Sequence, residues 1–254
     1  MTTVHHLNCG MLKSPFMEKA ICHCLLLEDK NGLALVDTGF GVADVLNPVR
    51  RIGQEMIDSF SIEFDMNLTA LSQIQKMGLS SKDISHCIIS HLDFDHIGGL
   101  SDFPEALVHI SGEEYKSFKK GNPRFLPAQF EHKPKFRIYD RADTTWYCLP
   151  ARKLEIGFNA DVFLIPLFGH TLGHCGVAIK KHSKWLFYAA DAFYMKEELL
   201  TDNHPVTRAA AVAAESDELR LESFRQIKHL LANNYNEIDI CCYHDPDGLN
   251  TINL

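Results

Sequence analysis

Ser90-His91-Leu92-Asp93-Phe94-Asp95-His96 follows directly on an apolar run that has the character of a buried strand. Within it, His91, Asp93 and Asp95 alternate with apolar residues, so an extended chain places these three side chains on one face. His96 breaks the alternation, and the glycine pair that follows gives the backbone room to turn there. One tight loop thereby offers four side chains to metal ions, and its imidazole and carboxylate groups suit zinc, iron, manganese or cobalt.

Further histidines and aspartates stand at the ends of other strand-like runs. The stretch Gly169-His170-Thr171-Leu172-Gly173-His174 follows one of them, and the glycines beside His170 let the backbone approach closely. Asp191 follows the next, and its two oxygens can bridge two cations. His244 follows the last. A lone histidine after a strand is more often structural, but this recurrence indicates one shared metal site, with His174 supporting a ligand rather than acting as one.

The spacing of apolar residues predicts a mixture of strands and helices in a single domain over residues 1–254. A hairpin is expected around the Asn31-Gly32 turn, and helices at residues 68–77 and 218–233. Strands are expected at residues 20–27, 33–36, 84–89, 162–165, 175–179, 185–189 and 238–242. Residues 112–150 mix Gly, Pro, charged and aromatic residues. We expect a partly irregular excursion there, whose aromatic side chains either cover a pocket or pack the segment onto the body.

Composition and charge restrict the class of protein. The chain has 254 residues, of which 46% are hydrophobic and 23% charged, as in ordinary globular proteins. Its net charge of -8 argues against a nucleic-acid groove. None of the eight cysteines forms a C-x-x-C pair, so we expect reduced thiols and a cytoplasmic location. We expect neither a signal peptide nor a membrane span, because no run approaches the roughly 18 apolar residues that a span needs.

The ordered set of motifs resembles the metallo-β-lactamase superfamily of metallohydrolases, and its pattern is most similar to N-acyl-homoserine lactonase-like members. The family hallmark is H-x-H-x-D-H, which residues 91–96 match with one exception. Residues 169–174 are similar to the family's second histidine element, Asp191 to its bridging aspartate and His244 to its last ligand. Asp37-Thr38-Gly39 is similar to the family's early turn that supports the site. The matches cover most of the chain in the family's order.

This resemblance implies an α/β fold of the four-layer αββα sandwich type, with a two-metal site at one edge. By the same resemblance, one ion is held by His91, His170 and Asp191, and the other by Asp95, His96, His244 and Asp191. We expect two divalent ions, with zinc as the first choice. The expected partner is a small-molecule substrate, bound by a monomer or homodimer without nucleic acid or membrane.

Asp93 departs from the family pattern, because it stands where the family has its second histidine. We expect it to be a ligand, and a hard carboxylate at this position would favour iron or manganese more than a histidine would. Two other outcomes remain open. Asp93 could weaken the binding of zinc, or it could leave the first ion unbound and the enzyme effectively mononuclear.

The expected activity is the opening of a lactone, or the cleavage of a small ester, by a metal-bound hydroxide. Asp95 would steer the proton of that hydroxide. Tyr194, three residues after Asp191, resembles the tyrosine at this point of the lactonases, where its phenol would polarise the carbonyl or stabilise the leaving oxygen; a packing role is the other interpretation. The alternatives are a glyoxalase-II-like thioesterase, a mononuclear-iron dioxygenase, and a non-catalytic metal or ligand binder with a decayed site. The thioesterase is less favoured, because the sequence shows no convincing cluster of basic residues to hold a glutathione-type carboxylate.

Overall fold

The residues described by the computed structural model, 2–14, 16–201 and 204–249, form two six-stranded sheets. The first sheet has the strand order β1-β2-β3-β4-β5-β6, and the second β12-β11-β10-β9-β8-β7. The first contains β1 (Thr3–Ser14), β2 (Met17–Asp29), β3 (Gly32–Val36), β4 (Ile84–Ile88), β5 (Leu107–Ser111) and β6 (Lys135–Tyr139). The second contains β7 (Thr144–Trp146), β8 (Leu149–Lys153), β9 (Val162–Pro166), β10 (Cys175–Lys180), β11 (Trp185–Tyr188) and β12 (Ile238–Cys241).

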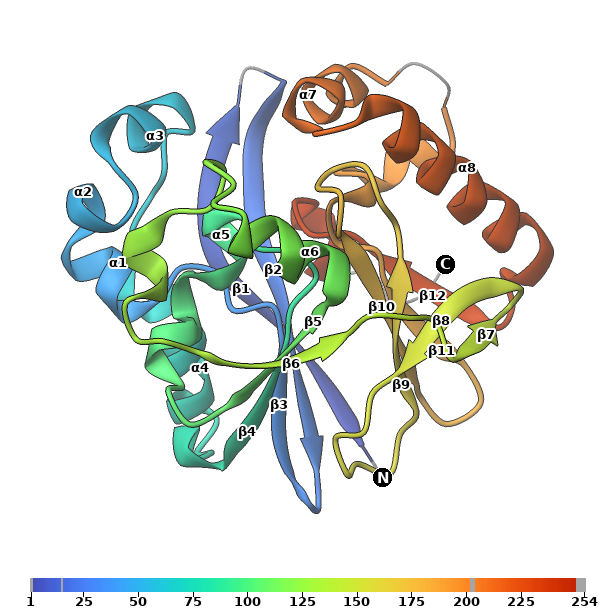
Figure 1. Cartoon of the computed structure of the whole chain (residues 1–254), viewed down its shortest axis with the longest axis horizontal. Helices are drawn as coiled ribbons and strands as arrows, with labels where there is room; N and C mark the ends of the chain where they lie inside the picture. The colour runs from blue at the N-terminus through green and yellow to red at the C-terminus, as the bar shows by residue number, and fades with distance from the viewer. Residues whose placement is uncertain (1, 15, 202–203, 250–254) are drawn as a thin grey trace.

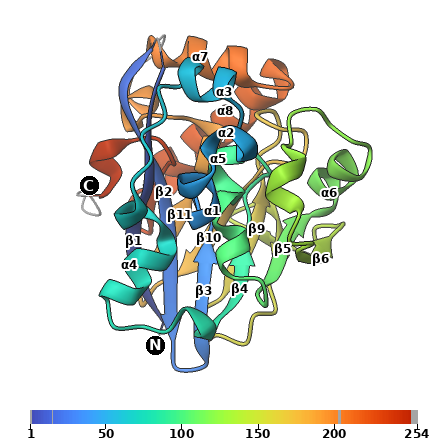
Figure 2. The same ribbon diagram turned by 90° about the vertical axis from the view of Figure 1, so that its left-hand side faces the viewer.

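Helices cover the outer faces of both sheets. In Figure 1 the helices α1 to α4 lie on one side of the paired sheets and α7 and α8 on the other, and Figure 2 shows α1, α2, α4 and α5 in front of the first sheet. They are α1 (Val42–Leu46), α2 (Pro48–Arg51), α3 (Gln54–Ser59), α4 (Ala70–Lys76), α5 (Phe94–Ile97), α6 (Gly112–Lys119), α7 (Val206–Ala213) and α8 (Asp217–Asn234). The predicted αββα sandwich is confirmed.

The direction of the strands explains why the motifs meet. The hairpin of β2 and β3 is antiparallel, as predicted, but β3, β4, β5 and β6 run parallel to one another, and so do β11 and β12. Parallel strands end at the same edge of a sheet, where ligands bind in open α/β sheets. The loops after β4, β11 and β12, which carry acidic and histidine side chains singled out in the sequence, therefore reach the same region.

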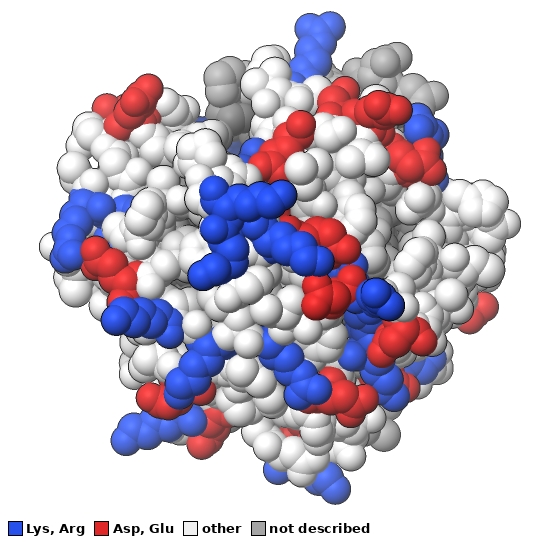
Figure 3. Space-filling view, in the orientation of Figure 1, with Lys and Arg blue, Asp and Glu red and all other residues white. Residues whose placement is uncertain are grey.

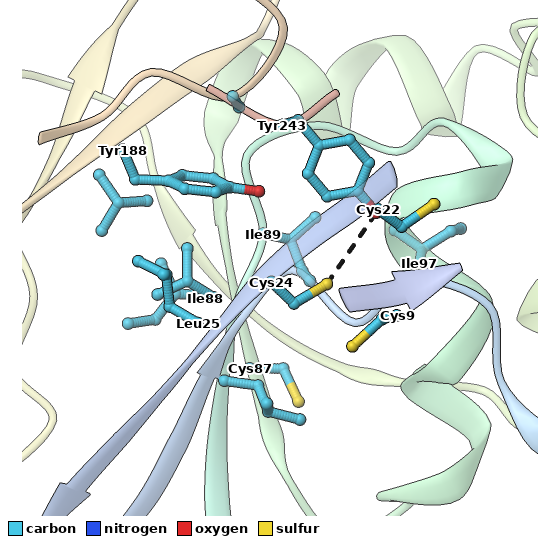
Figure 4. Packing of buried hydrophobic residues seen from close by; sticks show 14 of the residues in the cluster. Cys9, Cys22, Cys24, Leu25, Cys87, Ile88, Ile89, Ile97, Tyr188 and Tyr243 are labelled. Atoms are coloured by element: carbon cyan, nitrogen blue, oxygen red, sulfur yellow. Dashed lines mark hydrogen bonds between the residues drawn. The ribbon is translucent and has the colours of Figure 1, made fainter. Parts of the chain in front are cut away.

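The core between the sheets contains sulfur and tyrosine side chains as well as aliphatic ones. Cys24 of β2 points toward Tyr243, which lies in the loop after β12 (Figure 4), and Cys24, Cys87, Tyr188 and Tyr243 are all fully buried. The Cys24 Sγ atom lies 3.9 Å from the Tyr243 hydroxyl. All eight cysteines are free thiols and seven of them are buried, in keeping with their expected role as small apolar residues.

The segment 112–150 is more regular than predicted. It contains α6, β6, β7 and the start of β8, whose short apolar stretches are interrupted by charged and exposed residues. Its aromatic residues pack on one another and on the body: the ring centroids of Phe118 and Phe130 are 4.5 Å apart, and those of Tyr115 and Phe136 are 5.3 Å apart. The sequence pattern also missed β1, β5, the short helices α1 to α3, and α7.

Charges of both signs share the face that carries α6. Figure 3 shows basic side chains gathered over this part of the molecule, with acidic side chains directly beside them. The exclusion of a nucleic-acid partner stays a prediction. Among the helices that the structure describes, none has the length and apolar character needed to cross a bilayer.

Candidate metal centre

Six of the predicted ligands converge where strands of both sheets end. They form two groups, and within each group the potential ligand atoms lie within 4.8 Å of one another: His91, His170 and Asp191, and Asp95, His96 and His244. The first sheet supplies residues 91–96, from the loop after β4 and from α5. The second supplies His170 from the loop between β9 and β10, Asp191 from η5 (Ala190–Ala192), and His244 from the loop after β12. All six side chains are buried.

Asp191 lies between the two groups. Its Oδ2 atom is 3.3 Å from His170 Nε2 and 3.4 Å from His244 Nε2, and its Oδ1 atom is 3.4 Å from His96 Nε2. Burial alone would raise the pKa of Asp191, but the neighbouring imidazoles, His244 foremost, bring it well below its ordinary value. The side chain is therefore an ionised carboxylate in contact with both groups, which is what a bridging ligand requires.

Three buried polar atoms of this cluster lack a hydrogen-bond partner among the described residues: His91 Nε2, His96 Nε2 and Asp191 Oδ1. An unpaired polar atom in a protein interior costs roughly 1–3 kcal/mol. A divalent cation would pair with all three, because neutral imidazole nitrogens and carboxylate oxygens are ordinary ligands of zinc and related ions. The side chains present at the site therefore fit a metal.

The predicted supporting turn lies beneath His96. Asp37, directly after β3, has Oδ2 at 2.8 Å from His96 Nδ1, and the same oxygen accepts hydrogen bonds from the hydroxyls of Ser90 at 2.7 Å and Tyr188 at 2.6 Å. A carboxylate that accepts from Nδ1–H leaves Nε2 unprotonated. Asp37 therefore fixes the tautomer and the orientation in which His96 presents a lone pair to the cluster.

Two other contacts hold the ligand loops in place. His174 Nε2 accepts the backbone N–H of Asp191 at 3.1 Å, while its Nδ1 lies 2.9 Å from the carbonyl oxygen of Leu167. His174 thus belongs to neither ligand group and supports the Asp191 loop. The hydroxyl of Tyr243, in the loop after β12, donates to the backbone oxygen of Asp95 at 2.5 Å, which ties α5 to the last ligand loop.

Glu114 joins the two histidine loops and was not expected from the sequence. Its Oε1 accepts the backbone N–H of Leu92 at 2.9 Å and its Oε2 accepts the hydroxyl of Thr171 at 2.7 Å. These residues are the immediate neighbours of His91 and His170. Burial raises the pKa of Glu114 to about 7. Only its place near the start of a helix marks it in the sequence, and many surface glutamates share that place.

We expect Glu114→Gln to alter the pH dependence of stability in the metal-free protein. The native pKa of Glu114 is about 7 and its ordinary value is 4.5, so the folded state retains a proton that the unfolded state releases. The contribution of this retained proton to the free energy of unfolding is complete below about pH 4.5. It is lost as pH rises through about 7, a change of about 3 kcal/mol at most. Glutamine keeps the acceptor for Leu92 but cannot ionise, so the variant lacks this change.

Urea unfolding of both proteins at about pH 5 and about pH 8 measures the difference. We expect the difference in free energy of unfolding, variant minus unchanged protein, to be larger at about pH 8 than at about pH 5. Equal differences at both would contradict the assigned ionisation.

Asp93 lies beside the first group but has another partner. Its Oδ2 atom is 3.2 Å from His91 Nε2 and 2.9 Å from His170 Nε2. Both of its oxygens also accept hydrogen bonds from Arg124, at 2.5 Å each. Burial would raise the pKa of Asp93, but the Arg124 guanidinium, together with the His91 and His170 imidazoles, outweighs burial and holds the pKa well below its ordinary range. Whether Asp93 is a metal ligand stays a prediction.

Arg124 is the principal site residue that the sequence pattern missed. It lies in the loop between α6 and η4 (Pro127–Phe130), 31 positions after Asp93, where no periodicity or motif distinguishes it. The carboxylate in place of the expected histidine was the available signal, because a buried negative charge needs a partner. This signal indicates that the partner is positively charged, but not where in the sequence the partner lies.

Tyr194 lies at the same site, next to the second histidine element. Its hydroxyl is 3.4 Å from His170 Nδ1, and its ring stands perpendicular to that of His244 with centroids 5.0 Å apart. Burial, together with the negative charges of Asp191 and Asp93, raises its pKa well above the ordinary value. The phenol therefore remains protonated at neutral pH and is able to donate a hydrogen bond.

A cavity of about 240 Å³ opens onto the cluster. Its polar floor contains Asp93, Asp95, Arg124, His170, Asp191, Tyr194 and His244, and its apolar wall contains Leu12, Met17, Met56, Phe60, Phe94, Ala209 and Ala213. The wall comes from the tip of the β1–β2 hairpin and from α3, α5 and α7. Of the segment 112–150, Arg124 alone lines this cavity, so its aromatic residues do not form the wall. A larger cavity of about 510 Å³ between α8 and β12 contains none of the ligand residues.

Sequence comparisons match the chain to a described family over most of its length. The model of the metallo-beta-lactamase superfamily matches residues 18–233. A probable metallo-hydrolase of Mycobacterium tuberculosis is 33% identical over 257 residues, which cover 96% of this chain and 80% of that protein. An N-acyl homoserine lactonase of Bacillus cereus is 28% identical over 213 residues, covering 82% of this chain and 75% of that protein.

Comparison with solved structures gives the same fold. An N-acyl homoserine lactone hydrolase, solved with the product N-hexanoyl-L-homoserine at its catalytic metal centre, superposes with a TM-score of 0.73. Its sequence is 20% identical, and the match covers 96% of this chain and 93% of that one. A dizinc quorum-quenching lactonase superposes with a TM-score of 0.61 at 22% identity, covering 90% of this chain and 74% of that one. At this level of identity the likeness concerns the fold alone.

Proposed function

Since this chain belongs to the metallo-beta-lactamase superfamily and is a metallohydrolase by family, we propose that its reaction is the opening of a lactone or the cleavage of a small ester. The observation that carries the proposal is the pair of ligand groups joined by Asp191, with unpaired nitrogen and oxygen atoms, at the floor of a cavity whose wall is apolar. An apolar wall above a few convergent polar groups is the usual form of a small-molecule site.

The ligand groups would together hold up to two divalent ions, and zinc is the first candidate because imidazole nitrogens and carboxylate oxygens suit it. The residues concerned are His91, His170 and Asp191 in one group, and Asp95, His96 and His244 in the other, with Asp93 beside the first. A divalent cation at such a site supplies hydroxide at neutral pH by lowering the pKa of water toward about 7.

The side chains around the ligands have separate tasks in the proposed reaction. The carboxylate of Asp95 accepts a hydrogen bond from the attacking water and so aligns it. The Tyr194 phenol donates to the carbonyl oxygen or to the leaving oxygen as negative charge develops there. The methionine and phenylalanine side chains of the wall take up the acyl part of the substrate and exclude water.

The known activities of similar proteins guide the choice of the first substrates to test. N-acyl homoserine lactonases are among the proteins similar to this chain, at 23% to 28% identity. We therefore place N-acyl homoserine lactones first, followed by aryl esters. The thioesterase alternative requires a basic residue that is available to bind the carboxylate of a glutathione-type substrate, and the guanidinium at this site is already paired with Asp93.

Turnover should be measured with metal-reconstituted protein on a parallel set of acyl homoserine lactones, aryl esters and S-acyl glutathiones. We expect release of a carboxylic acid from at least one lactone or ester. Asp239→Asn, a change at a partly buried residue of β12 that is paired with Lys184, serves as a control that leaves the site intact. Turnover of thioesters alone would replace the proposed substrate class, and no turnover on any member of the set would favour the non-catalytic binder.

Cytoplasmic location, a monomeric or homodimeric state and a single domain over residues 1–254 are further proposals from the sequence. Size-exclusion chromatography with light scattering distinguishes the two assembly states.

A further inference from the structure

Arg124 makes a dense set of contacts within the first ligand group. Its Nε donates to Asp93 Oδ1 and its Nη2 to Asp93 Oδ2, each at 2.5 Å, so the pair is bidentate. Its Nη1 donates to the backbone oxygen of Ala213, after α7, at 2.6 Å. The same Nη2 lies 2.9 Å from His170 Nε2. The guanidinium is thus fixed on three sides, and 24% of its side chain remains exposed toward the cavity that it lines.

The contact with His170 excludes a metal ion at the same atom. An imidazole nitrogen has one lone pair, which either accepts an N–H or binds a cation. His170 Nε2 is the ring nitrogen that faces the bridging carboxylate, 3.3 Å from Asp191 Oδ2, and it also lies 2.9 Å from Asp93 Oδ2. An arginine side chain is always charged in proteins, so a fixed positive charge occupies the position where the first ion would be held. A dication there would be repelled at close range.

The second ligand group has no such occupant among the described residues. His96 Nε2 and Oδ1 of the bridging Asp191 lack any hydrogen-bond partner there, and the distances from Asp95 Oδ2 are 3.9 Å to His96 Nε2 and 3.7 Å to His244 Nε2. His91 Nε2 of the first group is unpaired as well, so the two groups differ at His170, which Arg124 contacts. The two halves of the centre therefore differ: a guanidinium contacts a ligand atom of the first group, and the described residues show no such contact in the second.

We propose that Arg124 takes the place of the first metal ion, so that the protein binds one divalent ion tightly, at Asp95, His96, Asp191 and His244. The inference rests on the proposed function, because it presumes that the second ligand group binds metal. It also gives Asp93 a role: a carboxylate at this position neutralises the guanidinium, which a histidine would not do. Arg124, while paired with Asp93, then supplies a fixed positive charge near the oxygens of a bound ester, in place of an ion's.

The test is the metal stoichiometry of the full chain, stripped with a chelator and titrated with Co²⁺, with bound metal counted by elemental analysis after dialysis. We expect one Co²⁺ per chain in the unchanged protein. Arg124→Met should bind a second ion about 10- to 100-fold more tightly than the unchanged protein does, the range seen when outer partners of ligands are altered. The double variant Asp93→His with Arg124→Met, which removes both charges, should bind two ions tightly.

Matched variants give the position of the ion. Arg50→Met removes an arginine whose Nη2 donates to both oxygens of a carboxylate, Glu131, but on the surface, and this variant should leave the stoichiometry at one. His244→Ala should lose the single ion, and His91→Ala should keep it. The far-ultraviolet circular dichroism and the thermal midpoint of each variant establish that it is folded before its metal is counted.

The outcomes separate this inference from the proposed function. Two tightly bound ions in the unchanged protein would overturn the replacement by Arg124 and leave the metallohydrolase proposal in place. So would a single ion in both Arg124 variants, or a single ion lost from His91→Ala and kept by His244→Ala. No bound metal in the unchanged protein would overturn the proposed function itself.

Discussion

Replacing Asp191 by asparagine is expected to remove bound metal and to lower turnover about 1,000-fold or more, the effect of losing several kcal/mol of charge stabilisation. The carboxylate contacts His170, His96 and His244 at 3.3–3.4 Å, and it is ionised despite its burial. An amide has the same shape but no charge, and its nitrogen is a donor that would face imidazole nitrogens. Fewer ligand atoms would then remain for a cation in either group.

Elemental analysis and turnover of Asp191→Asn should be compared with those of Asp239→Asn. Asp239 also sits in the second sheet and is paired with Lys184 at 3.3 Å, but it lies outside both ligand groups. The control should keep its metal and its rate. Undiminished metal content and turnover in Asp191→Asn would contradict the assignment of this residue to the centre.

Tyr194→Phe is expected to lower kcat by about 10- to 1,000-fold, the range for removing one donor to a developing oxyanion. The hydroxyl is buried, protonated and directed into the cavity floor beside His170, so its loss removes a donor without opening the pocket. The bound metal should be unchanged, because the phenol is not among the ligand atoms. The KM should change less than kcat, since the donor acts mainly as charge develops.

Tyr139→Phe provides a matched control. The Tyr139 hydroxyl also pairs with an imidazole nitrogen, that of His109 at 2.9 Å, but at β6 and away from the cavity. Its kcat should equal that of the unchanged protein. If Tyr194→Phe loses metal along with rate, the hydroxyl acts by positioning His170, and a kcat within about twofold of the unchanged value would leave Tyr194 a packing residue.

Much of the architecture follows from local patterns. Apolar runs of four to eight residues, ended by glycine or by a histidine loop, predicted most of the inner strands, and these were confirmed. The site residues could be grouped because each follows a strand, and strand ends meet at one edge of a sheet. The structure accordingly brings six of the predicted ligands within 4.8 Å of one another in two groups.

The remainder depends on contacts that periodicity does not encode. Edge strands such as β6 (Lys135–Tyr139) are largely exposed and alternate with charges, so they lack an apolar signature. Arg124 and Glu114 reach the site from outside the ligand loops, and their partners are fixed by tertiary packing rather than by spacing. The presence of a carboxylate at position 93 indicated that a counter-charge was needed, and the three-dimensional arrangement identified it as Arg124.

Because the metal ligands and most of the cavity wall come from different elements, the two can vary separately in such proteins. The ligand side chains are anchored in loops and in α5, whereas the wall, apart from Phe94 of α5, is supplied by a hairpin tip and by the α3 and α7 segments, which contribute no ligand. Mutations that reshape the wall can therefore accumulate without disturbing the reactive centre. A lineage built on this plan is free to exchange one acyl group for another while the chemistry at the floor is inherited intact.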